Sequence, residues 1–174
     1  MFRNALAVLS IVIIFRIDAF SQTGSHSIDG RESTLAKREL LNSALAMIDS
    51  GDLDRSIVYL DSLLRIEPAN PEAFLYKARI FGWQGDSASA IDILSGGVER
   101  SPRTVRLRTA LARLLIETKA YDDAWNHVDK ALAVISNDGE ALYLKGLILE
   151  KRGDIDNALE MYKKAAAVSL GGLK

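Results

Sequence analysis

A fixed spacing between Gly-Asp pairs is the sequence feature that most constrains what this chain can fold into. The pairs are Gly51-Asp52, Gly85-Asp86 and Gly153-Asp154, and the second interval is twice the first. Lys119-Ala120 occupies the remaining place in that register. A period of about 34 residues is the signature of a repeat protein, in which each unit packs on its neighbours. We therefore expect an array of similar units.

Small residues follow the same register. They form two sets, Ala44, Ala78, Ala112 and Gly146, and Ser56, Ala90, Ala124 and Ala158. Around them, apolar residues such as Phe74, Ala78 and Phe81 recur at spacings of three and four, which places them on one face of a helix. Two helices approach to about 8–10 Å only where the residues at the crossing point are small. The sequence predicts one helical hairpin in each period, with Ala78 and Ala90 at a crossing point.

The residues between the apolar stretches predict where the helices end. Gly85 suits the left-handed conformation that follows a helix, and Ser87 offers a hydroxyl to cap the next helix. Pro68 and Pro71 bracket a boundary between periods, because proline cannot continue a helix interior.

In these features the chain resembles the tetratricopeptide repeat family, which has the same period. The resemblance implies an all-α, right-handed α-solenoid of about eight helices over residues 37–174, with repeats at 37–70, 71–104, 105–138 and 139–172. Four residues depart from the family pattern. Arg108 replaces a bulky apolar residue, Leu63 replaces a small one, and lysine stands at positions that are often leucine, namely Lys77 and Lys145.

The resemblance also implies a concave groove lined by the first helix of each repeat. Carried over to this sequence, the expected partner-binding residues are Tyr76, Arg79, Trp83, Arg106, Thr109, Arg113 and Tyr143. Arginine and aromatic side chains dominate binding hot spots. They favour an extended peptide with acidic groups, or a carboxylate, as the ligand. The alternative is that Arg79 and Arg113 cover apolar neighbours with their methylene stems and that Tyr76 is packing.

The first residues are typical of a secretory signal peptide at residues 1–21. Arg3 precedes an apolar run from Ala5 to Phe15, and Ala19 and Ser21 supply small residues before a cleavage site. Residues 22–36 are expected to form a flexible leader and the start of the first helix. The expected location is the periplasm or cell envelope, with no stable transmembrane span after cleavage. An uncleaved N-terminal anchor is the alternative.

Composition disfavours several chemical functions. The chain has no cysteine and two histidines, which excludes thiol nucleophiles and cysteine-based metal sites, and no metal or cofactor is expected. A net charge of -1 argues against nucleic acid as a partner. His127 and Asp123 have helical spacing, but such a pair is far more often a surface pair than a catalytic one. We therefore expect a protein that is not an enzyme.

The leading expectation is an exported interaction scaffold that binds a peptide or protein partner, which could be an envelope component. The alternative is a truncated or split assembly module of an outer-membrane or polysaccharide-export system. Residues 78–85 are similar to the repeats that precede the barrel in YaiO-like outer-membrane proteins, although no barrel strands follow. End-on self-association is a further expectation, because a last helix without a successor would leave four residues unshielded: Leu159, Tyr162, Ala166 and Val168.

Overall fold

The computed structural model describes residues 30–171, and it describes side chains from residue 33 to residue 170. The predicted signal peptide at residues 1–21, and residues 22–29 of the predicted leader, lie outside this range. The chain divides into two compact parts between Ala36 and Lys37. The boundary falls within the first described helix, and the packing described below is that of the second part.

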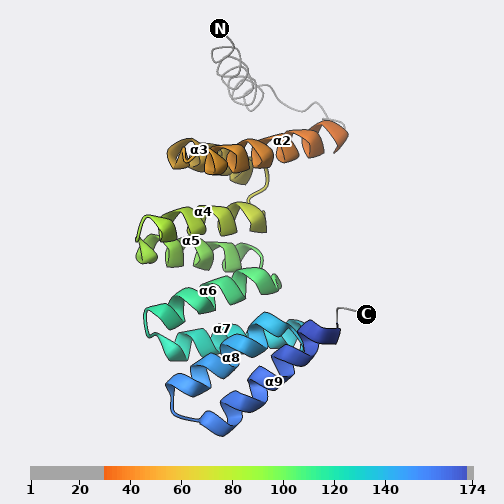
Figure 1. Ribbon diagram of the computed structural model, residues 1–174. Coiled ribbons are helices and arrows are strands. Elements are labelled where there is room, and N and C mark those ends of the chain that lie inside the picture. Colours follow the sequence, from red (N-terminus) through yellow and green to blue (C-terminus); the bar gives the residue numbers. More distant parts are fainter. Residues whose placement is uncertain (1–29, 172–174) are drawn as a thin grey trace. The chain divides into compact units, whose positions relative to one another are not determined.

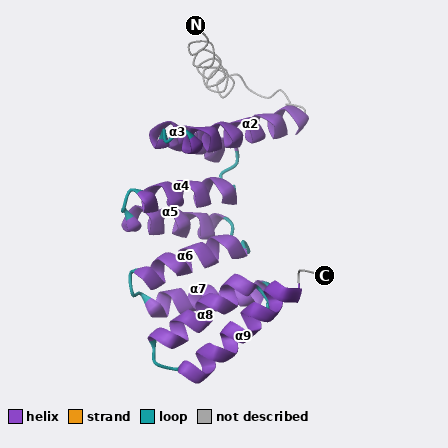
Figure 2. Cartoon of the chain, in the orientation of Figure 1, coloured by secondary structure: helices purple, strands orange, loops and turns teal. Residues whose placement is uncertain are grey.

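The described residues form eight α-helices, and residues 30–171 contain no β-strand (Figure 2). The prediction of an all-α fold is confirmed. The helices are α2 (Gly30–Asp49), α3 (Leu53–Ile66), α4 (Pro71–Trp83), α5 (Ser87–Arg100), α6 (Val105–Glu117), α7 (Tyr121–Val134), α8 (Gly139–Lys151) and α9 (Ile155–Gly171).

Helices that follow one another in the sequence pack side by side, joined by short loops (Figure 1). Contacts also join α4 to α6 and α6 to α8, which are the first helices of consecutive repeats. Each repeat therefore packs on the next, as a solenoid requires. Helices α4, α6 and α8 therefore form one continuous wall, and this wall positions the candidate site.

The predicted crossing points lie in the core. Ala44, Ser56 and Ala90 are fully buried, and the Ser56 hydroxyl donates a hydrogen bond of 3.0 Å to the Ala44 carbonyl oxygen. In the fourth repeat, a Cβ atom added to Gly146 would lie 3.1 Å from the carbonyl oxygen of Ala158. The small residues therefore set how closely the two helices of each repeat approach.

The turns between paired helices share one backbone conformation. Gly51, Gly85 and Gly153 have φ values of 79°, 79° and 83°, and Lys119 has a φ of 65° at the equivalent place. Glycine adopts this left-handed conformation without strain, whereas a residue with a Cβ atom does so at a cost of about 1–2 kcal/mol. Packing of the third repeat therefore holds Lys119 in a conformation that its own preference opposes.

Aspartate, not serine, caps the second helices α3 and α5. Asp86 precedes α5, and its carboxylate accepts hydrogen bonds from the Ser89 amide at 3.0 Å and the Ser89 hydroxyl at 2.6 Å. These bonds hold the pKa of Asp86 below its ordinary value. The expected cap, Ser87, is instead the first residue of the helix, because the aspartate after the turn glycine already fills the capping position. Ala120 takes that position before α7 and provides no side-chain hydrogen bond.

The charged departures from the family pattern find partners within the fold. Lys77 pairs with Asp61 at 2.6 Å, and Lys145 pairs with Asp129 at 2.7 Å. Both pairs span 16 residues, so the same contact between repeats occurs twice. The largely buried Arg108 donates two hydrogen bonds, of 2.9 and 2.6 Å, to the Pro102 carbonyl oxygen, and burial lowers the pKa of its guanidinium.

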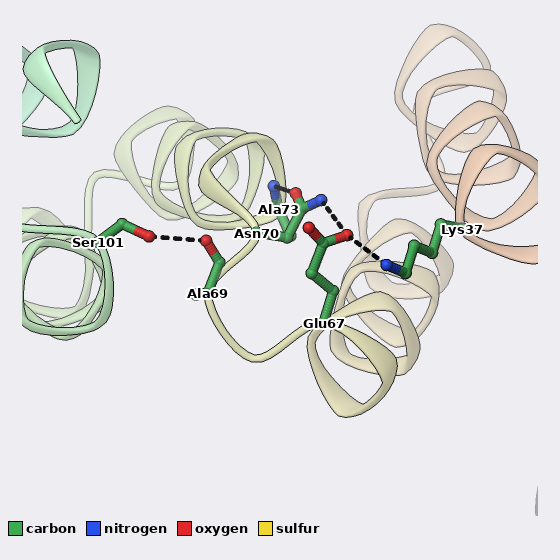
Figure 3. Close-up of polar contacts among 6 residues, drawn as sticks. All are labelled: Lys37, Glu67, Ala69, Asn70, Ala73 and Ser101. Atoms are coloured by element: carbon green, nitrogen blue, oxygen red, sulfur yellow. Dashed lines mark hydrogen bonds and ion pairs between the residues drawn. The ribbon is translucent and has the colours of Figure 1, made fainter. Parts of the chain in front are cut away.

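Polar contacts also hold the loop between the first two repeats (Figure 3). The Asn70 side chain accepts a hydrogen bond from the Ala73 amide at 2.9 Å and so caps α4. It also donates to Glu67, whose carboxylate pairs with Lys37 at 3.4 Å. Ser101, at the end of the second repeat, donates to the Ala69 carbonyl oxygen at 2.8 Å. These contacts fix where α4, the first helix of the candidate site, begins.

Candidate functional site

A groove of about 510 Å³ runs along the first helices of the second and third repeats. Helix α4 contributes one side and α6 the other, and Leu94 of α5 and Glu140 of α8 complete the lining. On each of the two first helices, the lining residues recur three or four apart, so they share one face. The remaining lining residues are Leu75, Tyr76, Ala78, Arg79, Gly82, Trp83, Arg106, Ala110, Arg113, Leu114 and Glu117.

Five of the seven predicted partner-binding residues line this groove, namely Tyr76, Arg79, Trp83, Arg106 and Arg113. The wall of first helices therefore brings residues from two repeats together, as the register implies. The other two predicted residues do not line the groove.

Thr109 and Tyr143 share one repeat position but lie in different surroundings. Thr109 is buried, and its hydroxyl donates to the Arg106 carbonyl oxygen at 3.2 Å. Tyr143 is exposed, and its ring lies 5.6 Å from that of Tyr162 on α9. The Tyr162 hydroxyl donates to Glu150 at 2.8 Å, and burial together with this contact raises the pKa of Tyr162 to about 12. Neither residue of this repeat position therefore reaches the groove, whereas Leu75, at the same position in the second repeat, does line it.

Arg79 lies between two aromatic rings in the groove. Its guanidinium carbon is 5.4 Å from the centre of the Tyr76 ring and 6.0 Å from that of Trp83. Trp83 is 57% exposed, so the ring is available to a ligand. Both distances lie within the range of a cation–π interaction, so the two rings attract the guanidinium.

The other two arginines of the groove already have carboxylate partners. Arg106 pairs with Glu72 at 3.2 Å, and Arg113 pairs with Glu140 at 2.8 Å. Within residues 33–170, Arg79 has no such partner, and its contacts are the two rings. Arg79 is therefore the groove arginine whose hydrogen-bonding capacity is open to a ligand.

Sequence reasoning missed several apolar residues of the groove, among them Ala110 and Leu114 of α6. Both lie on the same face of α6 as Arg106 and Arg113, at spacings of three and four residues. That helical spacing was the sequence signal that could have identified both residues as part of the groove. Their presence means that the groove offers apolar surface from α6 opposite the aromatic residues of α4.

Little in the described residues suggests catalysis. Residues 30–171 hold no group of three or more His, Asp or Glu side chains placed to bind a metal ion. Burial is the main cause that lowers the pKa of His127, followed by the nearby charges of Arg108 and Lys130, and its buried Nδ1 atom has no hydrogen-bond partner in this part of the chain. A base needs a partner that orients it, and Asp123 is not hydrogen-bonded to this ring.

None of the helices between residues 30 and 171 combines the length and the apolar character that a membrane span requires. This finding concerns the described residues and does not reach the apolar run at the start of the chain.

Comparison with known proteins places the last repeat in a sequence family. Residues 139–169 match the tetratricopeptide repeat. The chain is 31% identical over 93 residues to the BBSome complex member BBS4 of Bos taurus, a match that covers 53% of this chain and 18% of that protein. It is 26% identical over 117 residues to Tetratricopeptide repeat protein 13 of Homo sapiens, which covers 67% of this chain and 14% of that protein. The matches thus span less than a fifth of either relative.

Solved structures extend the similarity to the fold. The MamA protein of Desulfovibrio magneticus has a TM-score of 0.63 and 17% identity, over 78% of this chain and 76% of that one. The pilF protein of Pseudomonas aeruginosa has a TM-score of 0.69 and 18% identity, over 79% of this chain and 63% of that one. The described helices therefore share the fold of these solved structures, and residues 139–169 match the tetratricopeptide repeat.

Proposed function

We propose that this protein is a non-enzymatic interaction scaffold whose groove binds an extended, acidic segment of a partner protein. The observation that carries the proposal is Arg79, which lies over the rings of Tyr76 and Trp83 and has no carboxylate partner in the described residues. A carboxylate of the partner accepts hydrogen bonds from the guanidinium. Apolar side chains of the same segment pack against Trp83 and Leu114, which line the groove.

Three physical arguments support an acidic ligand. Hydrogen bonds between a guanidinium and a carboxylate are charge-assisted and about twice as strong as neutral ones. The two aromatic rings hold Arg79 in place before the ligand arrives, which reduces the entropy lost on binding. Three arginines and two glutamates, Glu117 and Glu140, line the groove, so its lining carries one net positive charge.

Similarity to other proteins is consistent with this role. The relative with 31% identity is a member of the BBSome complex, and assembly into a complex requires binding surfaces for partner proteins. In this chain, the groove brings together two aromatic side chains and three arginines. These are the side chains that most often dominate protein interfaces.

The direct test varies the ligand. A library of extended peptides that contain Asp or Glu would be compared with matched peptides in which every acidic residue is changed to Asn or Gln. Binding is read from the fluorescence of the exposed Trp83, with the Trp83→Leu variant as the control for the signal. We expect acidic peptides to bind at least tenfold more tightly than their amide counterparts, and the affinity to fall as salt concentration rises.

Equal binding of both peptide series would contradict the proposal, and so would an affinity that does not depend on salt. Binding that survives Arg79→Gln unchanged would also contradict it, because the carboxylate would then be recognised elsewhere.

We further propose that the protein is exported through residues 1–21 and acts in the periplasm or cell envelope. The basic start, the apolar run from Ala5 to Phe15 and the small residues before Gln22 support this proposal. Mass spectrometry of the chain recovered from cell fractions tests it: a mature N-terminus at Gln22 is expected, and a full-length cytosolic chain would contradict it. The identity of the partner separates this role from the alternative. A partner that belongs to an outer-membrane or polysaccharide-export system would make the protein an assembly module of that system.

A further inference from the structure

Gly82 is a glycine of α4 for which the fold itself gives no reason. It lines the groove, three residues after Arg79 and directly before Trp83. Its backbone does not have the positive φ of Gly85, so the conformation does not require glycine. Glycine within a helix is less stable than alanine. A glycine that neither the backbone nor the helix favours therefore needs an explanation in its surroundings.

Packing explains other glycines of the helices but not Gly82. A Cβ atom added to Gly97 would lie 2.8 Å from the Phe74 ring, and one added to Gly146 would lie 2.7 Å from the Tyr162 ring. Both positions have room only for glycine. A Cβ atom added to Gly82 would meet no atom within 4 Å beyond its chain neighbours and its own helix backbone. The missing side chain of Gly82 thus leaves open space in the groove.

The repeat register shows what is missing at Gly82. One period before and after it stand Ile48 and Ile116. Ile48 packs against the core of the first repeat, and Ile116 is buried in that of the third. The fourth repeat has Glu150, which accepts a hydrogen bond from a tyrosine hydroxyl. The second repeat therefore lacks a side chain that the others use, and we call the space beside this residue the Gly82 recess.

The surroundings of the Gly82 recess are apolar except for one charge. On α4, its neighbours in the groove are Ala78 and Arg79, one turn before it, and Trp83, which follows it. Helix α6 adds Leu114 to the lining of the same groove. Binding sites of this kind combine apolar surface with a few polar groups that fix the orientation of the ligand. An apolar side chain close to a carboxylate is complementary to this arrangement.

We propose that the Gly82 recess receives an isoleucine or leucine side chain of the partner, within two residues of the carboxylate that Arg79 binds. The size follows from the register, because the other repeats show that one isoleucine belongs at this position. The spacing follows from geometry. Gly82 lies about 4.5 Å from Arg79 along the helix axis, and an extended segment advances about 3.3 Å per residue. The inference rests on the proposed function and narrows its ligand to an acidic segment with an adjoining aliphatic residue.

Peptide pairs titrated into the full chain test the Gly82 recess. Each peptide is fluorescently labelled and carries a single Asp, with Ile at one of the two positions on either side of it, and its partner has Ala in place of that Ile. For at least one position, we expect the Ile peptide to bind the wild type about tenfold more tightly than the Ala peptide, because an aliphatic side chain becomes buried. No preference for Ile at any position would overturn the proposal.

The variant Gly82→Ile supplies the missing side chain from the protein itself. It should weaken binding of the preferred Ile peptide at least fivefold and leave binding of its Ala partner within twofold of the wild type. Such non-additivity identifies a direct contact between the two positions. Circular dichroism should show unchanged helix content. Equal weakening of both peptides would mean that the new side chain blocks the groove in general, and no weakening of either would mean that the recess is unused. Both results would overturn the proposal.

A smaller substitution keeps the test valid if Gly82→Ile disturbs the fold. Gly82→Ala should weaken binding of the Ile peptide about twofold to threefold. Gly96→Ala is the matched control, because Gly96 lies inside α5 and does not line the groove. It should leave the affinity unchanged. Equal effects of the two alanine variants would overturn the proposal.

Replacing Asp by Asn in the same peptides separates this inference from the proposed function. Equal binding of Asp and Asn peptides would contradict recognition of a carboxylate, whatever the preference for Ile. Binding that depends on Asp but shows no preference for Ile would overturn the Gly82 recess alone and leave the proposed function in place.

Discussion

Arg79 and Arg113 occupy the same repeat position in the second and third repeats, yet their surroundings differ. They are one repeat period apart, and both line the groove. Arg113 pairs with Glu140, which lies 27 residues further along the chain. The residue that stands in the same relation to Arg79 is Arg106, which has the same charge and turns instead to Glu72. The following repeat thus offers a glutamate to Arg113 but an arginine to Arg79. This single difference in charge leaves Arg79 without an acidic partner in the described helices.

This difference shows how a repeat array makes a specific site from similar parts. The backbone of each repeat brings its first helix to the same wall, so position alone would make the two arginines alike. The charge contributed by the following repeat decides which of them is available. Specificity in the groove thus depends on the order of the repeats as well as on the residues within one repeat.

The largest effect is expected from Arg106→Glu, which gives Arg79 the kind of neighbour that Arg113 has. The new carboxylate would pair with Arg79 and compete with the ligand. We expect the affinity for an acidic peptide to fall at least tenfold, or by about 1.4 kcal/mol. Calorimetric titration measures this, with Glu72→Gln as the control for loss of the original pair. An unchanged affinity would mean that Arg79 does not receive the carboxylate.

The second prediction concerns packing in the same two repeats. A Cβ atom added to Gly97 would lie 2.8 Å from the Phe74 ring, whereas the third repeat has Ala131 and Arg108 at the two equivalent positions. Overpacking costs about 1–3 kcal/mol, and alanine regains about 1 kcal/mol of helix propensity. Gly97→Ala should therefore lower the free energy of unfolding by about 1 kcal/mol in denaturant titration. A stabilised variant would show that Phe74 moves aside freely.

The third prediction compares the turns. Lys119→Gly should raise the free energy of unfolding by about 0.5–1 kcal/mol, because glycine removes the strain of a φ of 65°. Gly85→Ala should lower it by a similar amount, since the second repeat would then carry the same strain. Both changes are read as shifts of the denaturation midpoint. No change in either variant would mean that the turn conformation carries no strain.

The smallest effect concerns His127 in the third repeat. Burial, with the charges of Arg108 and Lys130, lowers the pKa of this histidine in the folded chain below 6.5. The unfolded chain therefore takes up the proton first, and stability present above about pH 6.5 declines as the pH falls below that value. The His127→Gln variant should lose less stability between pH 7 and pH 5 than the wild type does. Parallel pH dependence of the two proteins would contradict the pKa direction.

Much of the fold could be predicted from the sequence, because the features that determine it are local and repeated. The turn glycines and the small residues at the crossing points have single physical roles. Their register located all four hairpins, including the third, where Lys119 replaces the glycine. The cap was assigned to Ser87 instead of Asp86, because the sequence alone does not show at which residue helical geometry begins.

The site was less predictable, because its properties depend on contacts between repeats. The register placed five residues in the groove. It could not separate Thr109, which is buried, from Tyr143, which is exposed at the same repeat position. Nor could it show that Arg106 and Arg113 have glutamate partners while Arg79 lies over two aromatic rings. These differences arise from neighbours that are distant in sequence.

The central claim is that Arg79, and not its equivalent Arg113, receives the carboxylate of a partner. Calorimetric titration of one acidic peptide into wild type, Arg79→Gln and Arg113→Gln tests it most directly. We predict at least a tenfold loss of affinity for Arg79→Gln and less than a threefold loss for Arg113→Gln, with equal helix content in all three proteins. Equal losses in the two variants, or a greater loss for Arg113→Gln, would contradict the account.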